Sequence, residues 1–359
     1  MKQQNEYLDE NRGAGVGSKN PVGVIKDELV EAAEAGHVRP VEPPKAEDGK
    51  AVDTFSSRNE TFEPICLGAM RRLAVQSMCE RLNLTSRPAK VVPLLVDEEH
   101  KIAYCEISKA GSTSMKRVMA LATRAGRKLP SNFTIQSWHR PAFLKRMGLA
   151  FKKSNEISLQ FYTKFFIVRH PFDRLVSSYN DKVGPNSPGN GGYARFSRNI
   201  VKLNFPHLSD AELDRMPKPT FQQFVHALAG HQNLLRNNHW NPYADKYCDP
   251  CHIEYDHILR IESMSYDTLP IMRALKLGET FAEEARVKTY RNQRPKPSHL
   301  LVKDEPYARL RRLNDFRNVS EADLNVLEKY YDLEFKLYGY SFDRNTMLPG
   351  CKFDDTGCC

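Results

Sequence analysis

The stretch "CEISKAGSTSMKRVM", residues 105–119, leads from a β-prone run through a short polar loop into a helical pattern. Residues 101–107 are the β-prone run, and residues 112–125 place apolar side chains at helical spacing. The loop between them carries one basic, two small and three hydroxyl side chains, namely Lys109, Ala110, Gly111, Ser112, Thr113 and Ser114. Backbone N–H groups at the start of a helix lack intrahelical acceptors, and glycine lets the backbone approach a ligand closely. We therefore expect this loop to bind an anion, with Lys109 supplying the charge.

A second strand–helix unit follows in residues 164–183, "KFFIVRHPFDRLVSSYNDKV". Arg169 comes directly after a buried-strand run, and Ser177 lies eight residues further on, in the helix that Pro171 begins. A guanidinium and a hydroxyl so placed can bind a phosphate. The alternatives are an Arg169–Asp173 ion pair here and a simple Ser or Thr helix cap in the first loop. Two anion sites on consecutive units favour a nucleotide with phosphates at both ends.

Strands and helices alternate along most of the chain, which is typical of an α/β domain. Residues 257–262, "HILRIE", form a third candidate core strand. Residues 320–340 read as a final helix that Ser320 caps at its start and Gly339 ends. Because parallel strands need long crossovers, this order predicts a mainly parallel central sheet flanked by helices.

Changes in composition suggest the domain boundaries. Residues 1–60 are polar, charged and interrupted by proline, so we predict a flexible stem that buries too little apolar surface to fold. We assign residues 61–345 to one domain and residues 346–359 to a cysteine-containing tail. The sequence shows neither a run of about 18 apolar residues nor a signal peptide, so we expect membrane association only through an N-terminal anchor outside it.

The chain of 359 residues is basic, with 53 Lys and Arg against 44 Asp and Glu, a net charge of +9 and a pI near 9.0. Such a surplus favours an anionic partner. It does not by itself distinguish phosphates, nucleic acid, acidic lipid and acidic polysaccharide, so the charge leaves the partner open.

Two of the eight cysteines, Cys248 and Cys251, form a C-x-x-C pattern. A zinc site with four ligands needs a second pair at suitable spacing, and the sequence contains none. We therefore predict disulfides rather than metal, formed either between these two cysteines or with two others.

These residues resemble a known family. Lys109 to Arg117 is similar to the loop of sulfotransferases that binds the 5′-phosphosulfate, and residues 168–183 resemble their segment for the 3′-phosphate. Residues 239–262, "HWNPYADKYCDPCHIEYDHILRIE", and 330–340, "YYDLEFKLYGY", resemble the Golgi carbohydrate sulfotransferases of the chondroitin 4-O and HNK-1 group. The first loop departs from this family, which often has Cys-Thr-Asn where this chain has Ser-Thr-Ser. The resemblance extends over about residues 60–345.

The resemblance implies a P-loop-like sulfotransferase fold and 3′-phosphoadenosine 5′-phosphosulfate (PAPS) as the donor, without a metal. It implies a glycan hydroxyl as the acceptor, most typically the 4-position of N-acetylgalactosamine in chondroitin or dermatan. An acidic glycan rather than nucleic acid is then the partner, and the Golgi lumen the location. The residues expected at the donor are Lys109, Ala110, Gly111, Ser112, Thr113, Ser114, Arg169 and Ser177.

Transfer to an alcohol also needs a base, and histidine suits this task near neutral pH. His139 lies between the two donor-binding units, and His239 lies in the family-like downstream segment, so both are candidates alongside Lys109 as catalytic residues. His170 adjoins Arg169, where we expect it to brace the loop.

For the acceptor, we expect Arg117 to reach the site. The aromatic rings of Trp240 and Tyr243 can either stack on sugar rings or pack in the core, which is the commoner role of tryptophan. Two other functions compete. A phosphotransferase would need a P-loop lysine after the glycine and a magnesium-binding acid, and neither is evident. A polyanion-binding protein with a degenerate nucleotide site would explain the charge but not the paired loops.

Overall fold

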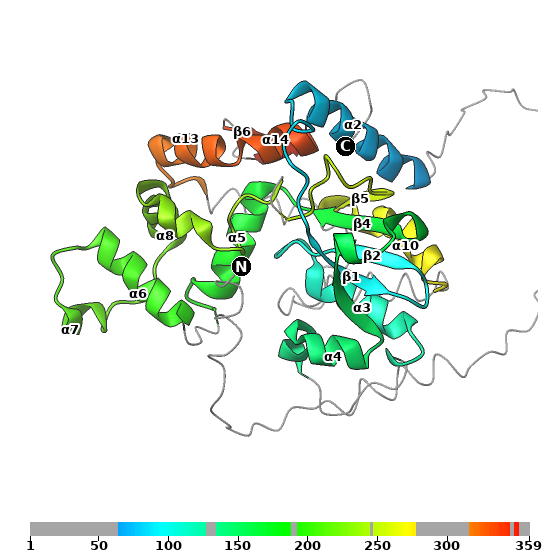
Figure 1. Cartoon of the computed structure of the whole chain (residues 1–359). Helices are drawn as coiled ribbons and strands as arrows, with labels where there is room; N and C mark the ends of the chain where they lie inside the picture. The colour runs from blue at the N-terminus through cyan, green and yellow to red at the C-terminus, as the bar shows by residue number, and fades with distance from the viewer. Residues whose placement is uncertain are drawn as a thin grey trace, which may run out of the picture. The chain divides into compact units, whose positions relative to one another are not determined.

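The two loops predicted to bind anions follow neighbouring strands of one five-stranded sheet (Figure 1). The strands lie in the order β3-β1-β2-β4-β5. β2 pairs in parallel with β4, and β4 with β5, while β1 runs antiparallel to both β2 and β3. Four strands thus share one direction, which agrees with the predicted mainly parallel sheet. Their bounds are β1 Pro93–Asp97, β2 Ile102–Cys105, β3 Leu149–Lys153, β4 Thr163–Val168 and β5 His257–Arg260.

The computed structural model describes residues 64–126, 134–187, 192–244, 247–277, 316–344 and 348–351. The chain divides into two units, residues 1–60 and 61–359, and every described residue belongs to the second. The predicted stem and most of the predicted C-terminal tail lie outside the described residues. Within the tail, β7 (Leu348–Cys351) pairs antiparallel with β6 (Tyr340–Asp343).

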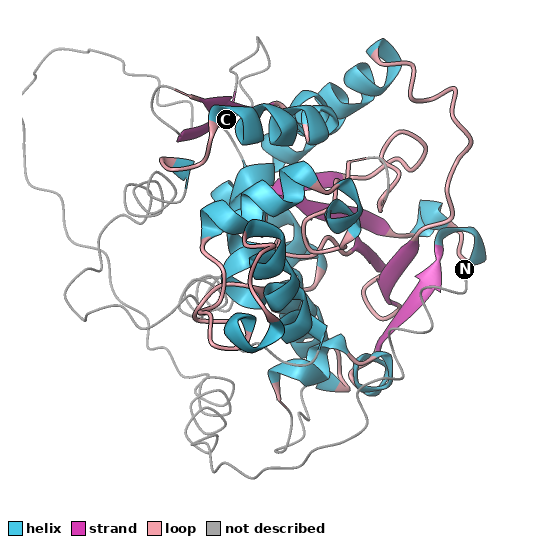
Figure 2. Cartoon of the chain, turned by 90° about the vertical axis from the view of Figure 1, so that its left-hand side faces the viewer, coloured by secondary structure: helices cyan, strands magenta, loops and turns pink. Residues whose placement is uncertain are grey.

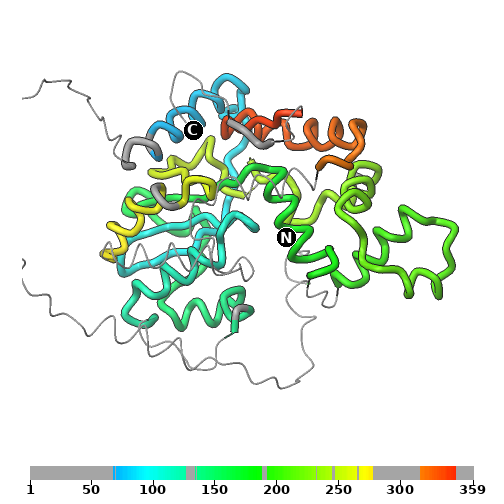
Figure 3. The backbone as a smooth tube through the Cα atoms, turned by 180° about the vertical axis from the view of Figure 1, so that it is seen from behind, coloured from blue at the N-terminus to red at the C-terminus, as the bar shows by residue number. Residues whose placement is uncertain are grey.

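Helices cover both faces of the sheet. Figures 1 and 3 show α2 and α14 on one side and α3 and α4 on the other, and Figure 2 shows the strands in magenta beside a further group of helices. The described α-helices are α2 Pro64–Arg81, α3 Ser112–Ala122, α4 Pro141–Arg146, α5 Pro171–Lys182, α6 Gly192–Asn204, α7 Asp210–Leu213, α8 Phe221–Gly230, α9 Met264–Asp267, α10 Leu269–Ala274, α13 Glu321–Tyr330 and α14 Asp332–Tyr338. Short 3-10 helices are η4 Ile135–His139, η5 Ser154–Glu156, η6 Leu159–Phe161, η7 Gln232–Arg236 and η8 Ile261–Ser263.

The buried apolar residues form two clusters. The first surrounds the sheet and contains the buried faces of β2 and β4, which read as continuous apolar runs because both faces of a central parallel strand are covered. The second packs α5 against α8 and α13 around Phe224, Trp240 and Phe316. Helix α5 follows β4 of the sheet in the chain and packs into the second cluster with α8 and α13. It therefore links the sheet to this helical cluster.

The final predicted helix is in fact two helices. Helix α13 ends at Tyr330 and α14 begins at Asp332, because Tyr331 leaves helical geometry with φ −100° and ψ 11°. Tyr331 is fully buried and donates its hydroxyl to the Trp240 carbonyl, a contact that a straight helix did not predict. The two caps are confirmed: the Ser320 side chain accepts the Asp323 N–H at 3.1 Å, and Gly339 adopts φ +66°.

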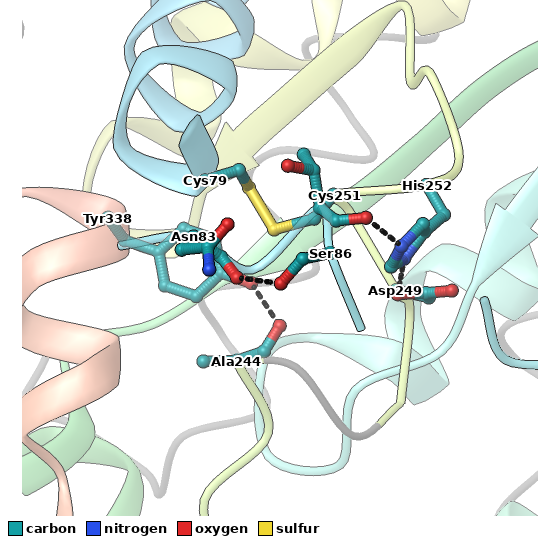
Figure 4. Close-up of a disulfide and its surroundings, with 9 residues drawn as sticks. Cys79, Asn83, Ser86, Ala244, Asp249, Cys251, His252 and Tyr338 are labelled. Atoms are coloured by element: carbon teal, nitrogen blue, oxygen red, sulfur yellow. Dashed lines mark hydrogen bonds and ion pairs between the residues drawn. A yellow bond between two sulfur atoms is a disulfide. The ribbon is translucent and has the colours of Figure 1, made fainter. Parts of the chain in front are cut away.

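Two disulfides cross-link the sheet region. Cys105 at the end of β2 is bonded to Cys248, and Cys79 of α2 is bonded to Cys251 (Figure 4). The predicted oxidation of the C-x-x-C pair is therefore confirmed, and of the two pairings left open it is the one with two other cysteines. Asp249 turns the segment with φ +46° and accepts a hydrogen bond from the Lys90 N–H at 2.7 Å.

The described residues offer neither a metal site nor a membrane-spanning helix. No group of three or more His, Cys, Asp or Glu side chains could hold a metal ion there. None of the described helices combines the length and apolar character needed to span a membrane.

Breaking the Cys105–Cys248 bond with the pair Cys105→Ser and Cys248→Ser should lower the free energy of unfolding by about 2–5 kcal/mol. The bond closes a loop with a sequence separation of 143, so its loss raises the conformational entropy of the unfolded chain. Urea unfolding measures the change, and peptide mapping without reduction tests the pairing. A peptide in which Cys248 is linked to Cys251 would contradict the structure.

Candidate active site

The first anion loop has the backbone geometry of a ligand-binding turn. Lys109 adopts φ +68° and Gly111 φ +78°, and helix α3 begins directly after Gly111. A Cβ atom on Gly111 would lie 2.9 Å from Cδ1 of Ile261, so glycine is favoured both by its φ and by the available space. No side chain caps the start of α3, so the predicted alternative of a Ser or Thr cap is not what this loop forms. The first N–H groups of this 11-residue helix thus donate no hydrogen bond to a capping side chain.

The second predicted anion loop, which begins at Arg169, is joined to the first by a hydrogen bond. Arg169 follows β4 and donates from Nη1 to the Lys109 carbonyl at 3.0 Å. Its backbone is held by Tyr243, whose hydroxyl donates to the Arg169 carbonyl at 2.7 Å. Among the described residues, Arg169 forms no ion pair with Asp173, and its buried Nε has no acceptor. The alternative of a loop ion pair is therefore not observed.

The Lys109 side chain points to the face of α5 that carries Ser177. Its Nζ lies 3.0 Å from Oδ2 of Asp181, and Ser177 stands four residues before Asp181, on the same helix face. Ser177 is half-buried. The structure thus places Lys109 in contact with Arg169 and with Asp181 of α5, the helix that also carries Ser177. Asp181 was missed, although its position one turn after Ser177 is visible in the sequence.

Lys109 and Asp181 shift each other's pKa values, and the cations around them contribute to these shifts. Burial lowers the pKa of Lys109, with Asp181 opposing this effect and the Arg169 and Lys182 cations adding to it. For Asp181, partial burial alone would raise the pKa, but Lys109 and Lys182 together outweigh it and the net pKa is lowered. Lys182 lies 3.3 Å from Asp181. Asp181 is therefore ionised at neutral pH and forms an ion pair with Lys109.

Arg174 on α5 is a second residue that the sequence analysis missed. It is 1% exposed and donates to three backbone carbonyls, those of Ser108, Asn238 and Asn241, at 2.9, 2.9 and 2.8 Å. Its guanidinium also stacks 4.9 Å from the ring centre of Tyr243. Arg174 thereby ties α5 both to the first anion loop and to the segment that carries His239. The sequence offered no signal for this role, because its acceptors are backbone atoms.

His239 lies beside this cluster. It is half-buried, its ring centre is 5.8 Å from that of Tyr193, and its carbonyl accepts the Ser178 hydroxyl at 2.7 Å. Burial, followed by the Lys182 and Lys109 cations, lowers the pKa of His239 to about 3. Its buried Nδ1 has no hydrogen-bond partner among the described residues.

His139 ends η4 and is exposed. Partial desolvation, followed by the Lys116 and Lys182 cations, lowers its pKa, while Glu106 and Asp181 oppose the shift. Solvent screens these effects at an exposed ring. Lys116 itself is buried and paired with Glu106 at 2.7 Å. Both candidate histidines thus lie within electrostatic reach of Lys182 and Asp181, and both are neutral at pH 7.

His170 braces the loop as predicted. Its Nδ1 accepts the Phe172 N–H at 3.2 Å, which caps α5, and its Nε2 lies 2.9 Å from the Ser341 carbonyl. The ring is buried among aromatic side chains. These contacts account for a histidine next to Arg169 without a catalytic role.

Trp240 and Tyr243 pack in the core, so the alternative in which their rings stack on sugars is wrong. Trp240 and Tyr243 are both fully buried. Trp240 donates from Nε1 to the Leu234 carbonyl at 2.9 Å, and the Tyr243 N–H donates to the buried carboxylate of Glu334 at 2.6 Å. Tyr243 supports the second loop through Arg169, Trp240 packs in the second apolar cluster, and no sugar can reach either ring.

Comparison with known proteins agrees with this geometry. The sequence matches the model of the sulfotransferase family over residues 92–341. It is 27% identical over 291 residues to carbohydrate sulfotransferase 11 of Rattus norvegicus, covering 77% of this chain and 76% of that protein. It is 30% identical over 255 residues to carbohydrate sulfotransferase 8 of Homo sapiens, covering 68% of this chain and 56% of that protein. No solved structure matches.

The chain therefore belongs to the sulfotransferase family, over most of its described residues. The recognition made from the two loops and the predicted α/β class are confirmed. As a member of this family the protein is an enzyme, with PAPS as its donor.

The depressed pKa of His239 predicts how stability depends on pH. The group has a pKa of about 3 in the folded protein against a reference value of 6.5, so the unfolded chain binds more protons between these values. The free energy of unfolding should then fall as the pH drops below about 6.5. His239→Gln should reduce this slope by up to about 1.4 kcal/mol per pH unit, as measured by urea unfolding at pH 7 and pH 5. An unchanged slope, or an equal reduction by His207→Gln at an exposed position, would refute the assignment.

Proposed function

We propose that this enzyme transfers a sulfuryl group from PAPS to a hydroxyl of a glycan, with the 4-position of N-acetylgalactosamine in chondroitin or dermatan as the acceptor. The observation that carries the proposal is the hydrogen bond from Arg169 to the Lys109 carbonyl. It joins two anion-binding loops into one site, as a donor with two separate phosphate groups requires. The names of the similar carbohydrate sulfotransferases support a glycan acceptor.

In this proposal the first loop holds the 5′-phosphosulfate. The N–H groups at the start of α3 and the hydroxyls of Ser112 to Ser114 donate to its oxygens. Arg169 and Ser177 hold the 3′-phosphate, for which Arg169 offers its remaining donors in a planar fork. An ATP molecule lacks that 3′-phosphate and cannot use this second half of the site.

In the free enzyme Asp181 forms an ion pair with Lys109, so the phosphosulfate of the donor has to displace this carboxylate from Lys109. The exchange is favourable because the donor brings more negative charge and further hydrogen bonds. Lys109 then lies at the bridging oxygen and stabilises the charge that develops there. In the transfer step the acceptor oxygen attacks sulfur, the bridging S–O bond breaks, and adenosine 3′,5′-bisphosphate leaves.

The acceptor hydroxyl loses its proton in this step. We assign the role of base to His139, with His239 as the alternative. Both rings are neutral before the donor binds, as a base must be, and the anionic donor would raise the pKa of each. His139 is exposed and open to a bulky acceptor, whereas His239 is half-buried with an enclosed Nδ1.

We also propose the Golgi lumen as the place of this reaction. The resemblance to Golgi enzymes supports it, and so do the two disulfides, which persist in oxidising compartments.

Donor binding gives the first test of this function. Adenosine 3′,5′-bisphosphate should bind far more tightly than ATP in isothermal titration. Arg169→Ala should weaken the bisphosphate by about 2–4 kcal/mol and Ser177→Ala by about 1 kcal/mol, because a charge-assisted contact is worth more than a neutral one. Asp181→Asn should instead strengthen binding, since it removes the carboxylate that competes for Lys109.

Equal affinity for ATP would refute a 3′-phosphate site. If neither nucleotide binds to the folded protein, the alternative of a polyanion-binding protein with a degenerate site is favoured. Circular dichroism should accompany each variant to show that the fold is retained.

The base gives the second test. His139→Ala should lower turnover by about 10²–10⁴-fold, because general base catalysis is lost. The affinity for adenosine 3′,5′-bisphosphate should barely change, because the imidazole acts on the acceptor proton. Steady-state kinetics with desulfated chondroitin measures the first quantity and titration the second. If His239→Ala abolishes turnover while His139→Ala leaves it intact, the two roles are reversed.

A further inference from the structure

Four cations lie on α3, η4 and α4 or at their ends, and η4, which His139 ends, packs against the other two elements. We call these cations the α4 basic patch and define it by Arg117 of α3 and by Arg140, Lys145 and Arg146 of the η4–α4 segment. The last three are exposed and Arg117 is half-buried. The sequence from residue 139 to residue 146, "HRPAFLKR", contains four basic or imidazole side chains and no acid.

The charges of the patch are not compensated within the described part of the chain. There, none of its four cations forms an ion pair or a hydrogen bond. Neighbouring surface cations behave differently: Lys101 lies 2.8 Å from Glu98, and Arg124 lies 3.2 Å from Glu99. Arg117 is notable because it is partly withdrawn from water, which lowers its pKa, and still has no carboxylate partner in this region.

The position of the patch relates it to the site. Arg140 directly follows His139, η4 packs against α3, and α4 packs against both η4 and β3. Figures 1 and 3 show α3 and α4 together on the same side of the sheet. His139 ends η4, which packs against both α3 and α4, so the proposed base and the patch lie on adjoining elements.

We propose that the α4 basic patch is the surface that binds the anionic chain of the acceptor, and that this patch sets the preference of the enzyme for an acidic polysaccharide over an uncharged one. The inference rests on the proposed function and extends it. Sugars that flank the reacting hydroxyl would carry carboxylate or sulfate groups, and these would lie along α4 while the hydroxyl faces His139.

A repeating polyanion suits this surface better than a single charged group. Arg140 precedes α4, and Lys145 and Arg146 end it. Because this six-residue helix is about 9 Å long, the cations at its two ends can meet different acidic groups of one chain at once. A single exposed ion pair contributes little to binding, but several pairs on one chain act together. Such binding should be strongly weakened by salt.

The first experiment measures polyanion binding without catalysis. The variant with Lys145→Glu and Arg146→Glu should elute from heparin-agarose at clearly lower salt than the wild type. The matched control carries Arg273→Glu and Lys329→Glu, two exposed cations on α10 and α13, and has the same net charge. The control should elute close to the wild type.

Equal elution of the two variants would show that only net charge matters and would overturn the proposal. Elution of the patch variant with the wild type would also overturn it, as expected if another part of the chain or a protein partner covers the patch. Should the Glu variant fail to fold by circular dichroism, Lys145→Gln with Arg146→Gln is tested in its place against Arg273→Gln with Lys329→Gln.

The second experiment measures transfer to desulfated chondroitin and to its carboxyl-reduced form, which has uncharged sugars. Wild-type enzyme should show a KM at least about tenfold lower for the acidic polymer, as expected from electrostatic attraction. The patch variant should lose this preference, with KM for the donor unchanged. A similar rise in KM for both polymers would contradict charge recognition. If the wild type sulfates neither polymer, the proposed acceptor is wrong, and the heparin result still decides the patch.

Discussion

The active site depends on one buried guanidinium, that of Arg174. This guanidinium has no carboxylate partner in the described region. It donates hydrogen bonds to three backbone carbonyls instead and stacks on an aromatic ring. Burying a charge is costly unless its hydrogen bonds are met, so the three carbonyls are held at fixed positions around it. Two of them belong to the segment on either side of His239, and the third belongs to Ser108. The spacing of the donor loop and the downstream segment is thus set by one side chain of α5.

The donor loop is fixed at three nearby points. Cys105 is covalently bonded to Cys248, the Ser108 carbonyl is bound by Arg174, and the Lys109 carbonyl is bound by Arg169. A loop that must present N–H groups to a phosphate benefits from this rigidity, because less ordering entropy is lost when the ligand binds. The left-handed backbone of Lys109 is a strained conformation that such fixing can maintain.

The electrostatics of the free site are those of a cationic site that is partly neutralised from within. Asp181 pairs with both Lys109 and Lys182, and burial, together with the neighbouring cations, lowers the pKa of His239 and keeps it neutral. Binding an anion here changes all of these groups together, because each acts on the others through a partly dehydrated environment. The α4 basic patch differs in kind, since its exposed cations have no internal partner in the described region and remain available to a second, larger anion.

The sequence by itself determined the features that depend on neighbours along the chain. The strand–loop–helix units, the caps at Ser320 and Gly339, and the residues of the anion site proposed at Lys109 are local patterns of residue type and spacing. It did not reveal β1 and β3, because strands of five residues at or near a sheet edge carry weak periodic signals.

Only the tertiary structure decided which distant groups meet. The pairing of Cys248 with Cys105, the carboxylate that occupies Lys109 and the backbone acceptors of Arg174 link segments tens to more than a hundred residues apart. Trp240 shows the same limit, since an aromatic residue can pack in a core or bind a sugar with no difference in local sequence. Burial and long-range contact are properties of the packed chain, and the spacing of residues along it does not encode them.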